Sequence, residues 1–364
     1  MTSEDPSYRY PEEGSFLLQN NSIDYDKPFI TYAQMIELME SRNIIVDDKD
    51  LAVMALQNFS YYSLVNGYKN TFIQDSSSDS FIDGTKFEEL YTLHIIDTGL
   101  NNILFKYIIY LEKALKSRLS YLISEKYGVY TDYNNHRNNS PDDYLSRRNY
   151  SSSNNRRSDI LWKLKSAIST ERHNPSIAHY INNKNHVPAW ILTTNIPYGL
   201  AIEWYGILKN DDKSMLCSTF IPNDDIAIES KKEFMRKALS LTKEYRNKIA
   251  HGNRTFNIWN LPVLPKNPLL TLCFNTIEED EYNRGLAQND LMAVILVIMV
   301  LFDDPFLLNN FYAELCNIIV PYDKDEFRIA NKTIYEILSL PNDFLQRLDK
   351  LLKRKFGFNI EDEQ

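Results

Sequence analysis

Apolar residues recur at intervals of three and four over most of the chain, a spacing typical of amphipathic α-helices. The longest such run extends from Phe87 to Tyr127 and stops at Gly128, a residue type that often follows the last turn of a helix. Further helical patterns cover residues 160–168, 200–208, 226–250 and 344–356. The patterning therefore predicts an all-α protein.

Two short helices are predicted near the N-terminus from their capping residues. Thr31 and Gln34 have the spacing of a capping box, and Asp48 precedes a helical pattern over residues 51–59. Residues 58–68 contain three Tyr and one Gly, which favours a packed turn whose tyrosine hydroxyls find hydrogen-bond partners. These rings either close a small helical lobe or stack on RNA bases.

Shifts in composition divide the chain into four regions. Residues 1–26 are polar and lack a period, so an irregular arm is expected there, and residues 27–75 form an N-terminal helical lobe. A Ser- and Asp-rich loop at 74–85 leads into a helical core at 84–256. Residues 257–364 are expected to add further helices.

The helical core contains a polar insertion at residues 131–158 that is rich in Asn, Ser, Tyr and Arg. It carries the strongest local positive charge of an acidic chain, at Arg147, Arg148, Arg156 and Arg157. One interpretation is a mobile surface insertion, and the other is a surface that contacts RNA phosphates. The sequence leaves both open.

The composition limits the class of protein. Hydrophobic residues make up 43% of the 364, and 10 Gly are few for this length, which favours long helices over a turn-rich β fold. The net charge of −9 argues against a broad, nonspecific nucleic-acid-binding surface. Any contact with RNA is therefore expected to be local.

The sequence also argues against a metal, a cofactor or a membrane segment. Cys217, Cys273 and Cys316 are odd in number and widely spaced, so neither a zinc site nor a disulfide framework is expected. The longest apolar stretch, Leu291–Phe302, is too short to span a bilayer and is predicted to be a buried core helix. No apolar run near Met1 resembles a signal peptide, so a cytoplasmic protein is expected.

Candidate chemistry lies at the end of the helical pattern over 226–250, where Arg246 and Asn247 are followed by His251. Arginine is a permanent cation that holds phosphate oxygens in a bidentate grip, and histidine titrates near neutral pH and moves protons. Asn247 is suited to orient either side chain. This combination favours chemistry at a phosphodiester, and Arg254 just beyond it is a further candidate RNA contact.

The spacing of Arg246 and His251 does not establish a site by itself. With six His in the chain, chance predicts about one Arg-to-His pair at so short an interval. Arg172 and His179 form a second pair, but it encloses Pro175, lies in a polar stretch and lacks an Asn after the Arg. We interpret the second pair as the chance match.

The helical pattern constrains the geometry of the motif. Tyr245 and Ile249 belong to the apolar stripe, so Arg246 is expected at the edge of the core. His251 lies about 140° further round an ideal helix, so the two side chains would point apart. Either the helix ends at Gly252, or two copies of the motif face each other in a two-fold dimer. A helix C-terminus would also favour a protonated His251.

Charged residues also occur in two helical patterns outside the motif. Glu112 and Arg118 in the long helix are expected to be solvated or ion-paired, with support of the Arg246 site as the alternative. The pattern at 344–356 is amphipathic and basic, and we interpret it as a solvated helix rather than a binding element.

Three blocks, in this order, resemble the abortive-infection (Abi) family of the AbiD/AbiF type, bacterial phage-defence proteins with a HEPN domain. The blocks are Lys27-Pro28 with residues 58–64 and Gly67-Tyr68; the long helix from Phe87 with Asp97, Glu112 and Arg118; and Val187-Pro188-Ala189-Trp190, Tyr198-Gly199 and the Arg246–His251 motif. They span about residues 27–260. The family often has Asn-Tyr-Tyr where Phe59-Ser60 here separates Asn58 from Tyr61-Tyr62, so these tyrosines receive no role.

The resemblance implies an activity that the residues suggest only in outline. HEPN domains of this kind are metal-independent endoribonucleases and usually dimers, so a HEPN-type helical bundle, an RNA substrate and a homodimer are expected. Arg246 and His251 would be catalytic, and Asn247 would orient them. Some AbiF-type proteins resemble toxins neutralised by a small RNA, which implies an inhibitory small RNA or antitoxin as a partner.

Two alternatives remain open at this point. In a non-catalytic module, Arg246 and His251 would grip RNA or a partner protein without cutting. The acidic net charge and the lack of another acid–base group near the motif favour this alternative. In a purely structural role, the two residues would form a satisfied pair in the core.

Overall fold

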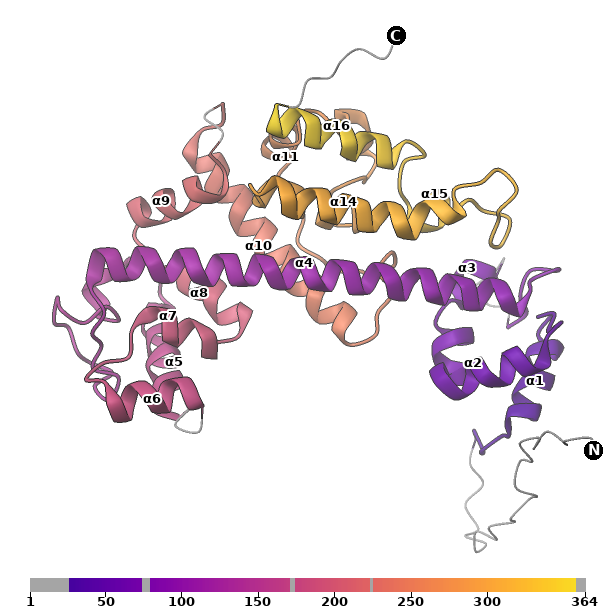
Figure 1. Ribbon diagram of the computed structural model, residues 1–364, viewed down its shortest axis with the longest axis horizontal. Helices are drawn as coiled ribbons and strands as arrows, with labels where there is room; N and C mark the ends of the chain where they lie inside the picture. The colour runs from indigo at the N-terminus through magenta and orange to yellow at the C-terminus, as the bar shows by residue number, and fades with distance from the viewer. Residues whose placement is uncertain (1–25, 74–78, 171–173, 223–224, 358–364) are drawn as a thin grey trace, which may run out of the picture.

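The longest helix described, α4 (Phe87–Tyr127), runs along the length of the molecule, and the other helices are arranged around it (Figure 1). In this computed structural model the described residues are 26–73, 79–170, 174–222 and 225–357. Within these ranges the chain forms helices and turns but no β-strand, apart from two isolated bridge pairs, Ile45 with Lys86 and Ile329 with Lys332. The predicted all-α class is confirmed. The arm expected at 1–26 lies almost entirely outside the described residues.

Helix α4 has both of the bounds that its hydrophobic pattern predicts. Most of its apolar residues are buried along its whole length, with no exposed surface at Leu90, Leu104 or Leu119. Gly128 follows the helix with a φ of 79°, which glycine adopts without steric penalty. At 1.5 Å per residue, its 41 residues extend about 60 Å, enough to carry a separate group of helices at each end.

One end of α4 carries an N-terminal lobe. It consists of α1 (Tyr32–Ser41), α2 (Lys49–Tyr61), a π-helical turn (Tyr62–Asn66) and α3 (Lys69–Phe72). Both predicted caps are confirmed, because the Thr31 hydroxyl accepts from the Gln34 N–H at 3.3 Å and Asp48 accepts from the third N–H of α2 at 2.9 Å. Tyr68 is buried in this lobe, whereas Tyr62 is exposed.

The other end of α4 carries a second lobe on the same side of the helix (Figure 1). It consists of α5 (Arg157–Thr170), α6 (Pro175–Asn183), α7 (Ala189–Leu192), a 3-10 turn (Thr193–Asn195) and α8 (Tyr198–Ile207). The polar segment 131–158 packs here around Asp143, whose buried carboxylate lies 2.7 Å from the buried Lys165 ammonium. Tyr144 and Tyr150 are also buried. The interpretation as a surface insertion is therefore wrong for the middle of this segment, which contributes to a core.

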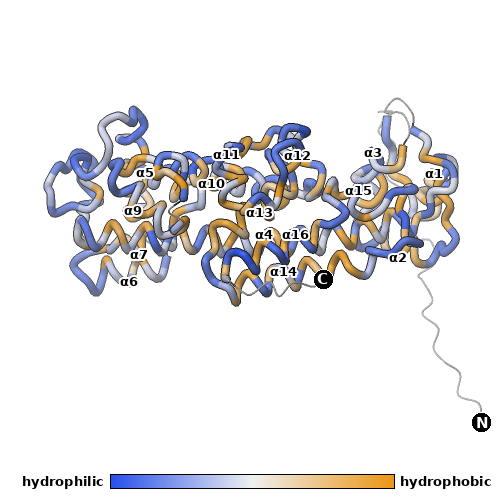
Figure 2. The backbone as a smooth tube through the Cα atoms, turned by 90° about the horizontal axis from the view of Figure 1, so that it is seen from above, coloured by the Kyte–Doolittle hydropathy of each residue, from blue (hydrophilic) through white to orange (hydrophobic). Residues whose placement is uncertain are grey.

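The remaining helices complete an elongated molecule (Figure 2). They are α9 (Asn210–Phe220), α10 (Ile228–Ala250), α11 (Lys266–Leu272), α12 (Glu279–Asn283), α13 (Leu291–Leu301), α14 (Pro305–Ile319), α15 (Ile334–Leu338) and α16 (Phe344–Phe356). Every residue of α13 is buried, and the helix packs against α4 and α10, which confirms the predicted core helix. Among the described residues, no helix has the combined length and hydropathy that crossing a membrane requires.

The basic residues of α16 are only partly solvated. The Lys355 ammonium donates to the carbonyl oxygens of Met299 and Val300, at 2.8 and 2.9 Å. These carbonyls end α13 and have no partner within that helix, so a cation there satisfies and stabilises the helix terminus. Arg347 lies 2.7 Å from the Glu281 carboxylate. The prediction of a solvated helix is wrong for these two side chains.

Candidate active site at the end of α10

Helix α10 places the Arg246–His251 motif as its apolar stripe predicts. Tyr245 and Ile249 are buried, and the Tyr245 hydroxyl donates to the Thr255 carbonyl oxygen at 2.5 Å. The helix ends at Ala250, and His251 is its C-cap residue. The following Gly252 has a φ of 83°. The expectation that the helix ends beside His251 is confirmed, since the chain leaves the helical path through this left-handed glycine.

Arg246 points toward α4 and meets a carboxylate there. One of its terminal nitrogens lies 3.1 Å from Glu112 Oε2, and the other donates to Asn247 Oδ1 at 3.2 Å. The Arg246 Nε–H is buried and has no hydrogen-bond partner in the described structure. Glu112 also pairs with Lys116 at 2.7 Å, which makes a row of alternating charges. The guanidinium is thus held in place while some of its N–H groups remain available to a ligand.

The two candidate support residues in α4 have different positions. Glu112 contacts Arg246, as the alternative interpretation of this residue expected. Arg118 instead lies 4.1 Å above the Phe220 ring and donates to the Thr219 carbonyl oxygen. Only Glu112 therefore supports the motif, and it provides the acid–base group that sequence reasoning did not place near Arg246. Residues 134 positions apart form this contact, so no local pattern could have revealed it.

His251 is exposed at the end of α10. Its backbone N–H donates to the Asn247 carbonyl oxygen at 3.2 Å. Within the described part of the chain, its imidazole makes no hydrogen bond or ion pair, either with Arg246 or with another residue. The structure therefore brings Arg246 and Asn247 together but leaves the His251 side chain free to meet a ligand or a second copy of the chain.

The segment after His251 is anchored to α4 through Asp97. This buried carboxylate accepts from the Thr255 backbone N–H at 2.8 Å and from the Thr255 hydroxyl at 2.6 Å. Its second oxygen accepts from the Tyr68 hydroxyl at 2.9 Å. Asp97 thus ties three segments together, namely the N-terminal lobe, α4 and the loop that follows the motif.

Arg254, a predicted RNA contact, is used in the same junction. Its guanidinium lies 4.2 Å from the centre of the Tyr68 ring and donates to the Ser63 and Gly67 carbonyl oxygens at 2.6 and 3.3 Å. A Cβ atom at Gly67 would lie 1.7 Å from this guanidinium, so the close approach requires glycine. Arg254 therefore has a structural function in this lobe, whatever contact it makes with RNA.

The four arginines of the polar segment lie in the second lobe, away from Arg246. Arg147 and Arg148 are exposed in a short 3-10 turn. Arg156 pairs with Glu203 at 2.6 Å, and Arg157 donates to two backbone carbonyl oxygens at 3.3 Å. The side chains of Arg147 and Arg148 make no hydrogen bond or ion pair with the described residues, so both stay available as candidate phosphate contacts. Arg172 of the second Arg-to-His pair lies outside the described residues.

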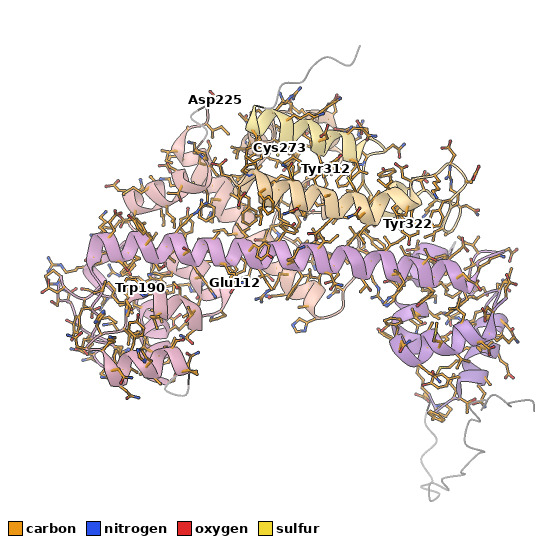
Figure 3. All side chains as sticks on the ribbon, in the orientation of Figure 1. Glu112, Trp190, Asp225, Cys273, Tyr312 and Tyr322 are labelled. Atoms are coloured by element: carbon orange, nitrogen blue, oxygen red, sulfur yellow. The ribbon has the colours of Figure 1, made fainter. Side chains whose placement is uncertain are left out.

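A cavity of about 550 Å³ opens beside Arg246, between α4, α7 and α10. Figure 3 shows Glu112 and Trp190 on the same side of α4, toward the second lobe. The lining residues are Ile109, Glu112, Lys113, Lys116, Ser117, Ser120, Trp190, Thr193, Thr194 and Arg246. Sequence reasoning did not assign Trp190 to the site, because only the fold brings α7 against α4.

Comparison with protein families places most of the chain's helical core in one family. Residues 54–257, more than half of the chain, match the family model described as Abi-like protein. The chain belongs to the Abi-like protein family. The match contains α4, the cavity and the Arg246–His251 motif, and the family indicates a role in abortive-infection phage defence. No curated protein and no solved structure matches the chain.

Proposed function

We propose that this Abi-like protein is a metal-independent endoribonuclease of the AbiD/AbiF type with a HEPN-type catalytic unit. One observation carries the proposal: Glu112 and Asn247 hold the Arg246 guanidinium at a cavity, and the exposed His251 follows on the same helix end. A fixed cation and a free imidazole together have the composition needed to cleave RNA without a metal. The family supports the setting of phage defence.

In the proposed reaction, the ribose 2′-hydroxyl oxygen attacks the adjacent phosphorus, and the bond from phosphorus to the 5′-oxygen of the next nucleotide breaks. A histidine takes the 2′-hydroxyl proton as the neutral imidazole and, once protonated, gives a proton to the leaving 5′-oxygen. Arg246 stabilises the negative charge that builds on the phosphoryl oxygens. The products carry 2′,3′-cyclic phosphate and 5′-hydroxyl ends, and DNA is spared because it lacks the attacking hydroxyl.

Two copies of the chain complete the site in this proposal. Arg246 faces α4, whereas His251 is exposed at the helix end with no side-chain partner among the described residues. In a two-fold dimer with facing motifs, Arg246 of one copy would act with the partner's His251. Such a nuclease must be restrained in a healthy cell, which supports an inhibitory small RNA or antitoxin as a further partner.

A non-catalytic RNA- or protein-binding module is the second candidate. It is favoured by the exposed His251 side chain, which no described residue orients for proton transfer. Under this candidate the same residues bind RNA, and RNA incubated with the protein remains intact.

Cleavage of total cellular RNA in excess EDTA distinguishes these candidates. We expect the wild type to cut, and Arg246→Ala and His251→Ala each to lower the rate about 100- to 1,000-fold, because each removes a group acting in the transition state. Matched controls are Arg236→Ala, an exposed arginine of α10, and His179→Ala, an exposed histidine of α6. Both should cut at the wild-type rate.

The chemistry of the fragment ends completes this test. Cyclic phosphate ends that depend on Arg246 and His251 are the expected result. Equal cleavage by Arg246→Ala and the wild type would remove Arg246 from the chemistry. RNA binding without any cleavage in the presence or absence of EDTA would favour the binding module.

A further inference from the structure

The cavity beside Arg246 has the size of a small-ligand site. Its volume of about 550 Å³ lies within the range of roughly 300–1,000 Å³ that is usual for pockets holding small molecules. The Arg246 guanidinium forms part of its wall. A group bound here would therefore lie next to the phosphate that Arg246 contacts in the proposed reaction.

Trp190 gives this cavity an aromatic wall. It occupies the first turn of α7, whose neighbouring residues Ala189 and Leu192 are fully buried. Trp190 is nevertheless 44% exposed, and its indole N–H has no hydrogen-bond partner in the described parts of the chain. The Trp190 ring is large, it is carried by a helix whose neighbouring residues are buried, and it is not itself buried in the core. Such a ring is suited to stack against a planar ligand.

The charge of the cavity favours an anion. Lys113, Lys116 and Arg246 contribute three cations, and Glu112 is the one carboxylate among the lining residues. Glu112 is already paired with Arg246 and Lys116. The Lys113 ammonium is exposed, lies 5.9 Å from the centre of the Tyr110 ring and makes no ion pair with any described residue, so it is able to contact a phosphate. This local positive charge contrasts with the net charge of −9 for the whole chain.

We propose that the cavity holds one unpaired base of single-stranded RNA, stacked on Trp190 with its phosphate against Lys113, beside the scissile phosphate at Arg246. The inference rests on the proposed ribonuclease function and adds the substrate class. A base enters such a cavity only after it leaves the helical stack, so single-stranded RNA is bound and paired RNA is protected. Stacking accepts any base, so Trp190 selects for an unpaired nucleotide rather than for a sequence.

Binding of a short 2′-O-methyl RNA tests the cavity without requiring cleavage, because this RNA lacks the attacking hydroxyl. We expect Trp190→Ala to weaken binding about 5- to 100-fold, the range found when a stacking aromatic is removed, and Trp190→Phe to restore most of it. The control is Trp162→Ala, because Trp162 of α5 is 53% exposed but does not line the cavity. This variant should bind as the wild type does.

The same experiment separates the possible ligands. The 2′-O-methyl strand annealed to its complement should bind more weakly than the single strand. Equal binding of paired and single strands, of Trp190→Ala and wild type, or of a free mononucleotide and the strand would each overturn the proposal. If binding follows the expected pattern but natural RNA is not cleaved, the base site would stand and the nuclease proposal would be contradicted. If Trp190→Ala changes neither the cleavage of natural RNA nor the binding, the nuclease proposal would stand and the base site would be contradicted.

Discussion

At the residue scale, the site depends on Glu112. Its carboxylate lies 3.1 Å from Arg246 and 2.7 Å from Lys116, and only 12% of its side chain is exposed. Because this carboxylate is largely buried and also pairs with Lys116, its own position is restricted. It therefore gives the Arg246 guanidinium a fixed partner and limits its other orientations. The same carboxylate reduces the positive charge that a phosphate would meet. We infer that orientation matters more, because transition-state stabilisation requires donors that are already in place.

Glu112→Gln tests this function of a positioning residue. The amide keeps the shape of the side chain but binds Arg246 and Lys116 more weakly. We expect kcat to fall about 10- to 100-fold while KM changes less than about twofold, because orientation rather than binding is lost. Glu125→Gln, at an exposed position of α4, is the control and should keep the wild-type kcat. A kcat equal to that of the wild type in Glu112→Gln would show that Arg246 needs no such support.

At the element scale, the position of the motif depends on the joint between α4 and the loop after α10. Asp97 of α4 accepts two hydrogen bonds from Thr255 and one from Tyr68. Its carboxylate is buried, so these donors replace the water that it would otherwise bind. The C-terminus of α10, with His251, is therefore fixed on one side by the helix and on the other by this loop.

Asp97→Ala should loosen the joint. It leaves the Thr255 backbone N–H and the Tyr68 hydroxyl buried without their acceptor, and we expect the free energy of unfolding to fall by about 2–4 kcal/mol. Amide hydrogen exchange at Thr255 should accelerate as well. Denaturant unfolding and exchange mass spectrometry measure both effects, with Asp159→Ala on the exposed side of α5 as the control. Wild-type exchange at Thr255 in Asp97→Ala would show that other contacts hold the loop.

At the scale of the whole molecule, α4 connects two lobes, and His94 lies where the N-terminal lobe meets it. Burial lowers the pKa of His94 below its ordinary value of 6.5, the positive charge of Arg254 lowers it further, and the charge of Asp97 opposes this. Below about pH 6.5, the unfolded chain binds a proton at this histidine that the folded chain does not. The free energy of unfolding therefore decreases as the pH falls through this range.

Thermal or denaturant unfolding between pH 7.5 and 5 checks this effect. We expect the stability of the wild type to decrease below about pH 6.5 relative to that of His94→Gln, which cannot titrate there. Gln keeps a polar group next to the Tyr68 hydroxyl, which lies 3.2 Å from His94 Nδ1. His179→Gln, on the exposed side of α6, should behave as the wild type. Parallel pH profiles for the wild type and His94→Gln would contradict this assignment.

The sequence predicts those features of this fold that depend on neighbouring residues. The bounds of α4, the caps at Thr31 and Asp48, and the helix end beside His251 follow from spacing and capping within a few residues. The cavity and the placement of Glu112 against Arg246 join residues far apart in the chain. Local patterns carry no information on such contacts, which depend on how α4, α7 and α10 pack.

Local composition does not predict which polar segments are buried in this fold. The residues at 131–158 are predicted to lie on the surface because they are rich in Asn, Ser and Arg. Lys165 lies outside this segment, in a helix, yet it neutralises the buried Asp143 and makes burial of the segment possible. Arg254 is likewise predicted as an RNA contact, although its guanidinium donates to carbonyl oxygens of the N-terminal lobe. In both cases the decisive partner is distant in the sequence.

In the proposed site, Arg246 of one copy of the chain and the partner's His251 act on one phosphate. Mixing the inactive variants Arg246→Ala and His251→Ala under conditions that exchange subunits tests this claim most directly. Half of the composite sites in a mixed dimer would contain both an intact arginine and an intact histidine, so RNA cleavage with cyclic phosphate ends should return in EDTA. If the wild type cleaves RNA but the exchanged mixture stays inactive, the two residues do not meet across a dimer and the account is wrong.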